Sequence, residues 1–575
     1  MNVLQRSVAE LLVGFIRYFL YFVEAAAVLI LVQVALRRPA ARLRFRRLEA
    51  AFGQLARRRR LAVFTVGALA LAGRAVLLPV MPPRLPAIGD DFGYILSADT
   101  FAHGRLTNPP HPLWTYFETP HIIQQPTYSS MYFPAQGLFM AAGQVVTGNP
   151  WFGVWLSVGL MSAALCWMLQ GWLPPRWALL GGLLAVMRLA LFGYWMNSYF
   201  GGAVAALGGA LVLGALPRIM RTQRVWDSVM LALGLAILAT TRAYEGAVLA
   251  APVGLALLMW LCGKNRPPLG VSVVRVVIPM AVLLSMTAAG VGYYCRRVTG
   301  SPFLLPQQHQ RDMYAVAPYF IWQSPKAEPV YRQAALRGFY AGAEMGHFQW
   351  ARSLGGWPIA TLMKVRDYWL FYLGPVLTLP LVAFPWILRD RRIRLLLVTG
   401  AVFLAGLAVS MWFYPHYAAP ATGILYVIVL QSMRHLRLWK RPGGALLARG
   451  VPVICVLMVC VRLAAQPFSF WMPIDFPMTW CCTRPGGTYR ADVVSQLRAW
   501  GGKHLVLVEW KPGDNPFEQW VYNEADIDDA QVVWAWETEH PDDLLRYYAD
   551  RRVWRLRGTW YGPPEFGPYQ PNSGR

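Results

Sequence analysis

Long apolar segments recur along most of this 575-residue chain and constrain its fold more than any other feature. Runs of about 17–25 apolar residues are long enough to cross the ~30 Å hydrocarbon core of a bilayer as helices. Hydrophobic residues make up 56% of the sequence and charged residues only 14%, whereas about 25% of a soluble domain is charged. The sequence therefore predicts an α-helical polytopic membrane protein with about 11–12 transmembrane helices.

The distribution of basic residues predicts how these helices are oriented. The predicted spans lie near residues 61–80, 151–173, 176–194, 199–217, 226–242, 246–262, 271–292, 368–388, 394–412, 415–433 and 447–465. The block at 37–60 is strongly basic, and every second loop after it is basic too, which is typical of cytoplasmic loops. The net charge of +25 therefore indicates membrane orientation and not nucleic-acid binding. The segment 11–36 is either a further span or an interfacial helix.

This orientation divides the chain into three parts. Residues 1–60 form an N-terminal helix and a basic cytoplasmic segment, and residues 61–465 form the transmembrane domain, with outer segments at 81–150 and 293–367. Residues 466–575 carry 15 of the 29 acidic residues. Strand patterns at 504–510, 530–536 and 552–558 and a helical pattern at 541–550 predict a small extracytoplasmic α/β domain in this tail.

An acidic pair opens the first outer segment. Asp90 and Asp91 follow three prolines and precede a helical pattern that predicts an amphipathic helix on the outer membrane surface. Paired carboxylates there would face water at the height of the lipid headgroups. The alternative is that one of them only caps the helix. Because neighbouring residues of a helix point about 100° apart, only one of the two can face a shared site.

Other polar groups of the outer segments are further candidates. The first segment contains Glu118, Tyr132 and three histidines, whose spacing matches no compact metal-ligand motif. A divalent metal therefore remains open as a cofactor, with no residues assigned to it. His416 and Tyr417 lie at the outer mouth of another span, where a single histidine is more often structural than catalytic.

Several arginines are candidates for binding a phosphate group. Arg242 lies at the outer end of a span, where a charge is costly unless it has a function or pairs with Glu245. Arg188 is deeper and either binds a phosphate or extends its charge to the interface. The second outer segment adds candidates next to aromatic residues, which alternatively form an interfacial belt: Arg296, Arg297 and Arg311.

Nucleotide-dependent chemistry finds no support in the sequence. The chain has no Walker sequence, no GxGxxG after a strand and no GxSxG elbow. No predicted cytoplasmic loop is long enough for a nucleotide-binding domain. We therefore expect any chemistry to take place on the outer face, without ATP or sugar nucleotides.

The first outer segment resembles that of the GT-C superfamily of membrane glycosyltransferases, which includes protein O-mannosyltransferases and bacterial aminoarabinose transferases. In that family the first outer loop opens with an acidic pair, and a Tyr-Pro-Pro-like stretch follows. The corresponding segments here are GDDFGYILSAD (89–99) and YFPAQGLFMAAGQVVTGNPW (132–151). The family's general base maps onto Asp90. Asp91 replaces the usual Glu, which leaves open which acid acts.

The resemblance implies an inverting glycosyltransferase that moves a sugar from a polyprenyl-phosphate donor to an acceptor hydroxyl on a lipid, glycan or protein. It implies Asp90 as the base, with Asp91 as a substitute, and Arg242 as the best-placed phosphate ligand. The Arg- and Ala-rich composition suggests a bacterial inner membrane, with the site on its outer face. Further assignments are Arg296, Arg297 and Arg311 for the donor phosphate and Glu118, Tyr132, His416 and Tyr417 for acceptor or sugar.

Two other classes of protein remain as alternatives. A transporter or flippase of lipid-linked glycans would share the spans and the outer basic groups, but it usually has polar residues deep within several spans. A non-catalytic protein of envelope assembly would share the outer domain, but it has no need of an acidic pair at the membrane mouth. The acidic pair therefore favours the transferase.

Overall fold

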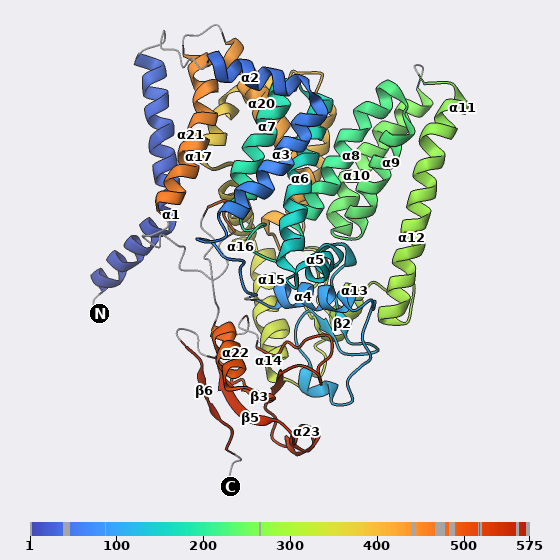
Figure 1. Cartoon of the computed structure of the whole chain (residues 1–575), viewed down its shortest axis with the longest axis vertical. Helices are drawn as coiled ribbons and strands as arrows, with labels where there is room; N and C mark the ends of the chain where they lie inside the picture. Colours follow the sequence, from blue (N-terminus) through green and yellow to red (C-terminus); the bar gives the residue numbers. More distant parts are fainter. Residues whose placement is uncertain are drawn as a thin grey trace.

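The computed structural model is a helical bundle with a small sheet domain at one end (Figure 1). It describes residues 3–37, 46–86, 88–263, 266–439, 443–465, 478–481, 489–515, 517, 520–558 and 563–570. The predicted domain boundary at 466 and residues 38–45 of the basic block lie outside these ranges. The fold class expected from the sequence, a helical membrane protein with a C-terminal α/β domain, is confirmed.

The bundle consists of helices at the positions of the predicted spans. The first half contains α1 (Val3–Arg37), α2 (Arg46–Arg57), α3 (Arg59–Val76), α6 (Trp151–Trp172), α7 (Pro175–Ala185) with its π-helical continuation η2 (Val186–Ala190), α8 (Gly202–Thr222), α9 (Val225–Ala239), α10 (Ala243–Cys262), α11 (Leu269–Ser272), η3 (Val273–Val277) and α12 (Ile278–Thr299). The second half contains η5 (Trp369–Leu373), α17 (Gly374–Thr378), η6 (Leu379–Ala383), α18 (Phe384–Ile387), α19 (Arg394–Ala408), α20 (Thr422–Leu438) and α21 (Gly444–Ala464).

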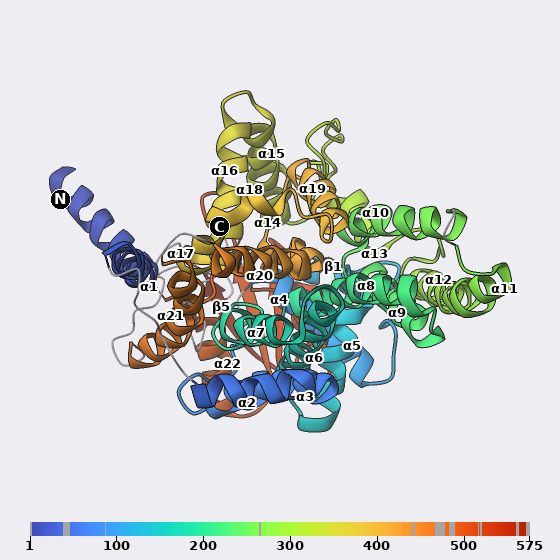
Figure 2. The ribbon, with the colours of Figure 1, turned by 90° about the horizontal axis from the view of Figure 1, so that it is seen from above.

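Seven helical segments of the described chain are long and apolar enough to cross a membrane, including the one that ends α1. Other predicted spans correspond to shorter helices, such as α9 and α19 with 15 residues each. Seen from above, α1 stands at one edge of the bundle and α11 and α12 at the opposite edge (Figure 2). The centre is densely packed: a Cβ added to Gly209 of α8 would lie 1.9 Å from the carbonyl oxygen of Pro420.

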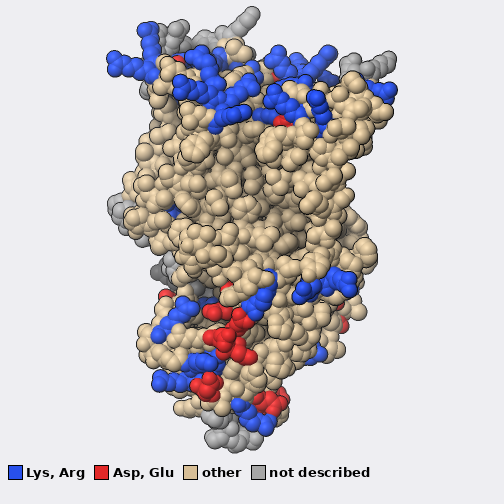
Figure 3. All heavy atoms as spheres, turned by 45° about the vertical axis from the view of Figure 1, so that its right-hand side comes forward, with Lys and Arg blue, Asp and Glu red and all other residues tan. Residues whose placement is uncertain are grey.

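Charge is distributed unequally between the two ends of the molecule. Lys and Arg side chains gather at the end that carries α2, and the middle of the molecule is almost free of charge (Figure 3). The opposite end carries both acidic and basic side chains. This pattern matches a bundle that is surrounded by lipid at its middle.

Both outer segments lie at the end of the bundle opposite to α2 (Figure 1). The first contains α4 (Gly89–Ala102), η1 (Trp114–Phe117), β1 (Ile122–Ile123), β2 (Ser129–Ser130) and α5 (Pro134–Thr147). The second contains α13 (Pro306–Tyr314), α14 (Ala334–Arg337), η4 (Gly338–Glu344), α15 (Met345–Arg352) and α16 (Gly356–Tyr368).

The C-terminal domain is a four-stranded sheet with two helices. It contains α22 (Tyr489–Trp500), β3 (His504–Glu509), β4 (Val532–Trp536), α23 (Asp542–Tyr547), β5 (Arg552–Arg557) and β6 (Glu565–Pro568). The strand order is β4-β3-β5-β6, and β3 pairs in parallel with both β4 and β5. The strands expected from the sequence are present within two residues of their predicted ends, and the expected helix within three. Residues of β3 are buried on both faces, as is typical of parallel sheets.

Helix α4 is enclosed between the bundle and this domain. Phe92 and Leu96 belong to a hydrophobic cluster with Leu505 and Leu507 of β3. Tyr94 and Ala98 point the other way, into the core of the bundle. The helix predicted as amphipathic and exposed on the membrane surface is thus buried on two sides, because the C-terminal domain covers the face that would otherwise meet water.

Candidate active site

The acidic pair lies in the first turn of α4. The helix is preceded by Ile88 in an extended conformation, and no side chain caps it. Asp90 and Asp91 therefore do not cap the helix, and their carboxylates lie where the helix dipole favours negative charge.

The two carboxylates point in different directions, as their position on a helix requires. Asp91 is fully buried and accepts a hydrogen bond from the backbone N–H of Tyr199 at 3.2 Å. Asp90 is partly exposed and accepts a hydrogen bond from the hydroxyl of Tyr132. Asp91 thus ties α4 to the segment before α8, whereas Asp90 remains accessible.

Aromatic side chains surround Asp90. The ring of Tyr132 stacks on Tyr94 with 4.2 Å between centroids, and the ring of His121 lies 6.0 Å from that of Tyr132 with an interplanar angle of 25°. Burial, together with the Asp90 carboxylate, raises the pKa of Tyr132 well above its ordinary value. The Tyr132 hydroxyl therefore stays protonated and orients the Asp90 carboxylate as a donor.

A cation lies on the far side of this aromatic cluster. Arg242 precedes α10, and its guanidinium lies 4.3 Å from the ring centroid of Tyr417. Tyr94 and Tyr417 interact electrostatically with both Asp90 and Arg242. Both rings therefore lie near the partly exposed Asp90 carboxylate and near the Arg242 guanidinium. We name Asp90, Tyr94, Tyr132, Arg242 and Tyr417 the Asp90 cluster.

His416 lies next to this cluster. It is buried, and its Nδ1 lies 2.9 Å from the hydroxyl of Tyr194, which also accepts the backbone N–H of His416 at 2.7 Å. Its ring stacks on Tyr414 with an interplanar angle of 4°. These contacts match the structural alternative for His416, because both Nδ1 and the backbone N–H are engaged within the fold.

Glu118 lies where the three outer parts of the chain meet. Its Oε1 accepts a hydrogen bond from the hydroxyl of Tyr314 at 2.8 Å and contacts Arg332 at 3.4 Å. Its backbone carbonyl accepts the indole N–H of Trp536 at 2.6 Å. Burial raises the pKa of the Glu118 carboxyl above its ordinary value. The described contacts of Glu118 are with the second outer segment and the C-terminal domain, not with Asp90.

The arginines of the second outer segment do not join the Asp90 cluster in the described part of the chain. Arg311 is buried, pairs with Glu344 at 2.8 Å and covers the ring of Tyr319, so its charge is already compensated. Arg296 and Arg297 are exposed at the end of α12. Of the arginines considered for a phosphate, Arg242 alone lies in this cluster.

Arg188 is also compensated. It is 4% exposed and pairs with Glu24 of α1 at 3.1 Å, beneath the ring of Trp480. Glu24 in addition accepts the backbone N–H of Val376. The arginine therefore does not extend to the interface, and the pair attaches α1 to the bundle.

Tyr94 was not among the site residues predicted from the sequence. Tyr94 follows Asp90 by four residues and therefore lies on the same face of α4, so the spacing alone could have identified it.

Within the described residues, no group of three or more His, Cys, Asp or Glu side chains is arranged to hold a metal ion.

No protein-family model and no curated protein matches this sequence. Solved structures are similar in shape. A crystal structure of an Archaeoglobus fulgidus oligosaccharyltransferase tethered with an acceptor peptide aligns with 86% of this chain and 68% of its own, at 10% identity and a TM-score of 0.46. ArnT from Cupriavidus metallidurans bound to undecaprenyl phosphate aligns with 86% of this chain and 92% of its own, at 12% identity and a TM-score of 0.43.

Both of these proteins are GT-C glycosyltransferases, the superfamily that the first outer segment resembles. With TM-scores below 0.5, the likeness carries no information on the activity of this chain.

Proposed function

We propose that this protein is an inverting glycosyltransferase that moves a sugar from a polyprenyl-phosphate donor to an acceptor hydroxyl, with Asp90 as the general base. The observation that supports it is the arrangement of the Asp90 cluster. A partly exposed carboxylate accepts a hydrogen bond from the Tyr132 hydroxyl, and the rings of Tyr94 and Tyr417 lie near both this carboxylate and Arg242. A base and a cation in one aromatic cluster match the two needs of a glycosyl transfer, which are removal of the acceptor proton and stabilisation of the leaving phosphate.

The proposed orientation in the membrane follows from the distribution of basic side chains. Basic side chains gather at the α2 end of the molecule (Figure 3), and such ends face the cytoplasm in multi-pass proteins. The Asp90 cluster lies towards the opposite end and would then face the outside of a bacterial inner membrane. Sugar nucleotides are absent there, which is why a lipid-linked donor is the proposed substrate.

The proposed reaction is a single displacement. The acceptor oxygen attacks the anomeric carbon and gives its proton to the Asp90 carboxylate, and the bond between that carbon and the phosphate oxygen breaks with its electron pair on the phosphate. Arg242 stabilises the growing negative charge on the leaving phosphate. One displacement inverts the anomeric configuration, and no covalent sugar–enzyme intermediate is needed.

In this mechanism Tyr132 and Asp91 position the base without touching the substrate. The Tyr132 hydroxyl holds one Asp90 oxygen, which leaves the other for the acceptor proton. Asp91 anchors the first turn of α4 through the N–H of Tyr199.

The test is transfer of a radiolabelled sugar from polyprenyl-phosphate donors to endogenous acceptors, in membranes with equal amounts of wild type or variant protein. We expect Asp90→Asn to abolish transfer. Asp312→Asn is the matched control, because Asp312 is an exposed acid of the outer segments that pairs with Lys326 at the surface. Transfer that survives Asp90→Asn would remove this base from the mechanism, and absence of transfer with a broad donor panel would favour a transporter or an assembly protein.

A further inference from the structure

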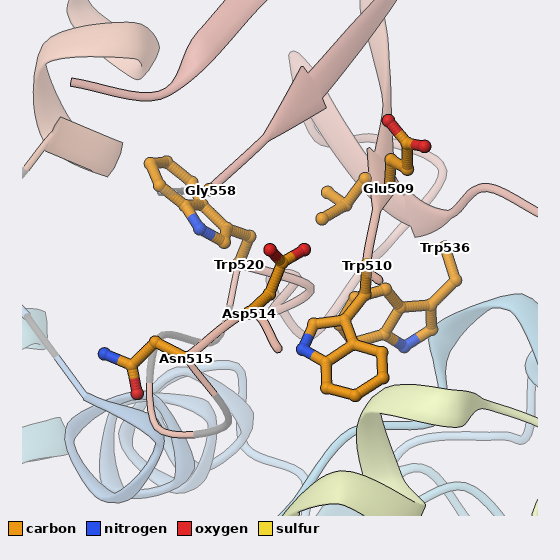
Figure 4. Close-up of a pocket in the computed structure, with 8 residues that line it drawn as sticks. Glu509, Trp510, Asp514, Asn515, Trp520, Trp536 and Gly558 are labelled. Atoms are coloured by element: carbon orange, nitrogen blue, oxygen red, sulfur yellow. The ribbon is translucent and has the colours of Figure 1, made fainter. Parts of the chain in front are cut away.

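A small cavity lies at the carboxyl ends of β3, β4 and β5 in the C-terminal domain. Figure 4 shows Trp510, Asp514 and Trp520 around it. Asp514 accepts the backbone N–H of Lys511 at 2.8 Å and contacts Arg557 at 3.3 Å, and Trp520 is almost fully buried. The cavity has space for about one water molecule, so it fits no larger ligand.

Two helices of the second outer segment form a hairpin that leaves the bundle. α15 and α16 are joined by residues 353–355 and lie against each other. Both helices lie at the height of α4 and α5 (Figure 1), and seen from above they extend sideways, away from α2 and α3 (Figure 2). We name residues 345–368 the apolar hairpin. It therefore runs along the outer end of the bundle and does not cross it.

The surface of the apolar hairpin consists largely of apolar side chains. Residues 353–363 contain no charged residue, and Leu354 in the turn is 98% exposed. Six large apolar residues are each more than a third exposed: Leu354, Trp357, Ile359, Leu362, Met363 and Val365. An exposed apolar surface of this kind indicates contact with a membrane or with another protein.

The directions of these side chains favour lipid over a protein partner. Successive residues of an α-helix point about 100° apart, so Trp357, Ile359 and Val365 are spread over more than half of the circumference of α16. A helix that packs on a protein usually has one apolar stripe, whereas a helix that is apolar on most sides is typical of a protein core or of a membrane. Because these residues are exposed, α16 is not part of a core.

The base of the apolar hairpin is attached to the outer end of a predicted span. The ammonium group of Lys364 donates to the carbonyl of Ala408, the last residue of α19, at 3.3 Å and to that of Ser410. Helix α19 has exposed apolar side chains of its own: Val398, Val402 and Leu404. The surface of the hairpin therefore adjoins a helix whose exposed side chains are those of a lipid-facing span.

The apolar hairpin also adjoins the Asp90 cluster. Phe348 of α15 is fully buried in one hydrophobic cluster with Met411, three residues before Tyr414. At the other end of the hairpin, Asp367 interacts electrostatically with Tyr414, which also interacts with Asp90. Both ends of the hairpin thus support the segment that carries Tyr414.

From these observations we infer that the apolar hairpin lies in the plane of the membrane, among the acyl chains of the phospholipid leaflet at this end of the molecule, and that this contact positions the second outer segment beside the Asp90 cluster. Helices that lie in the interface are buried about 5–10 Å into the boundary between headgroups and acyl chains. The lipid contact stands on the hairpin itself, whereas its effect on transfer rests on the proposed function.

Lipid contact is tested on the full-length protein in phospholipid nanodiscs. An encoded environment-sensitive fluorescent amino acid replaces Leu354, Leu362 or Val330. Val330 is the matched control, because it is an apolar residue of the same outer segment that is 96% exposed and lies outside the hairpin. The nanodiscs contain phospholipids whose acyl chains are brominated either near the carbonyl end or near the methyl end, and bromine quenches the fluorophore on contact.

We expect quenching at Leu354 and Leu362, stronger with bromine near the carbonyl end, and none at Val330. Absence of quenching at both hairpin positions, or equal quenching at Val330, would overturn the lipid contact. Stronger quenching by bromine near the methyl end would overturn the in-plane arrangement, because it would place the hairpin deep in the bilayer.

Transfer rates then separate this inference from the proposed function. Since Leu354 is almost fully exposed, Leu354→Asp acts chiefly through the surroundings of the protein, and Val330→Asp is its control. We expect both variants to keep the unfolding midpoint of the wild type in detergent. In nanodiscs, Leu354→Asp should lower the transfer rate about fivefold, which corresponds to about 1 kcal/mol, and Val330→Asp should not.

Each remaining result contradicts one part of the inference or the proposed function. Quenching at Leu354 with equal transfer rates in the two Asp variants would retain the lipid contact and reject its effect on the Asp90 cluster. Quenching without any transfer by the wild type would retain the lipid contact and reject the transferase.

Discussion

The guanidinium of Arg490 lies 4.4 Å from the ring centroid of Phe92 and 4.6 Å from that of Trp534. It is thus held between the helix that carries the acidic pair and the sheet of the C-terminal domain. Its N–H groups donate to the backbone carbonyls of Trp520 and Tyr522, and the ring of Tyr522 stacks on Phe92 at 4.6 Å. The C-terminal domain therefore determines the position of α4, only two residues from Asp90.

Replacing Arg490 should reduce activity through this contact. Arg490→Met loses two charge-assisted hydrogen bonds, each of which contributes about 1.5–3 kcal/mol. We expect a lower midpoint of thermal unfolding and a transfer rate reduced at least fivefold. The matched control is Arg498→Met, because Arg498 is an exposed arginine of the same helix. Equal rates for the two variants would show that α4 does not depend on the domain.

Replacing Asp90 should reduce activity, whereas replacing Asp91 should reduce stability. Asp91→Ala leaves the buried N–H of Tyr199 without its acceptor, which costs about 1–3 kcal/mol, whereas Asp91→Asn keeps an acceptor oxygen. We expect Asp91→Ala to lower the unfolding midpoint and Asp90→Asn to leave it unchanged while abolishing transfer. Thermal unfolding in detergent, combined with the transfer assay, provides both readouts. An active Asp90→Asn protein alongside a stable but inactive Asp91→Asn protein would reverse the two roles.

Replacing Arg242 should affect catalysis, whereas replacing Arg311 should affect stability. Arg242→Gln should reduce kcat about 10²–10³-fold, the typical effect of removing a group that stabilises transition-state charge. Arg311→Gln should instead destabilise the protein by about 3–5 kcal/mol, because it leaves Glu344 buried and unpaired. Arg296→Gln, at an exposed position, is the control. Steady-state kinetics and unfolding midpoints distinguish these outcomes, and an unchanged kcat in Arg242→Gln would exclude that residue as the phosphate ligand.

Glu118 should make stability depend on pH. Its carboxyl has a pKa in the folded state above the ordinary value of 4.5, chiefly because of burial. The folded state therefore binds this proton more tightly than the unfolded state, so the contribution of Glu118 is full below about pH 4.5 and declines as the pH rises through the folded-state pKa. Glu118→Gln keeps an acceptor for Tyr314 and removes the charge.

We expect Glu118→Gln to raise the unfolding midpoint more at pH 8 than at pH 4.5. Thermal unfolding at the two pH values measures the difference. The same increase at both values would contradict the raised pKa, and a higher KM for the acceptor would revive Glu118 as a binding residue.

Much of the fold could be predicted because its signals are local. An apolar run of sufficient length predicts a span wherever it occurs, and α6, α8 and α10 begin or end within a few residues of their predicted bounds. The strands β3, β4 and β5 were recognisable for the same reason, since each is a short segment that combines valine with leucine or tryptophan. The acidic pair was recognisable from its position between an apolar run and a helical pattern.

The partners of these residues could not be predicted, because they come from distant parts of the chain. Tyr132 lies 42 residues from Asp90, and Glu24 lies 164 residues from Arg188. Arg242 and Arg311 look alike in the sequence. Only the tertiary structure shows that Arg311 pairs with the buried Glu344 and that Arg242 lies against the ring of Tyr417.

The sequence by itself determined the helical membrane class, the small α/β tail and the helix that begins with two acids, because hydrophobic length and periodicity are properties of continuous segments. The tertiary structure alone decided which acid is accessible and which arginines pair with a buried acid. These relations depend on the direction in which each side chain points once the C-terminal domain covers α4, and no single segment contains that information.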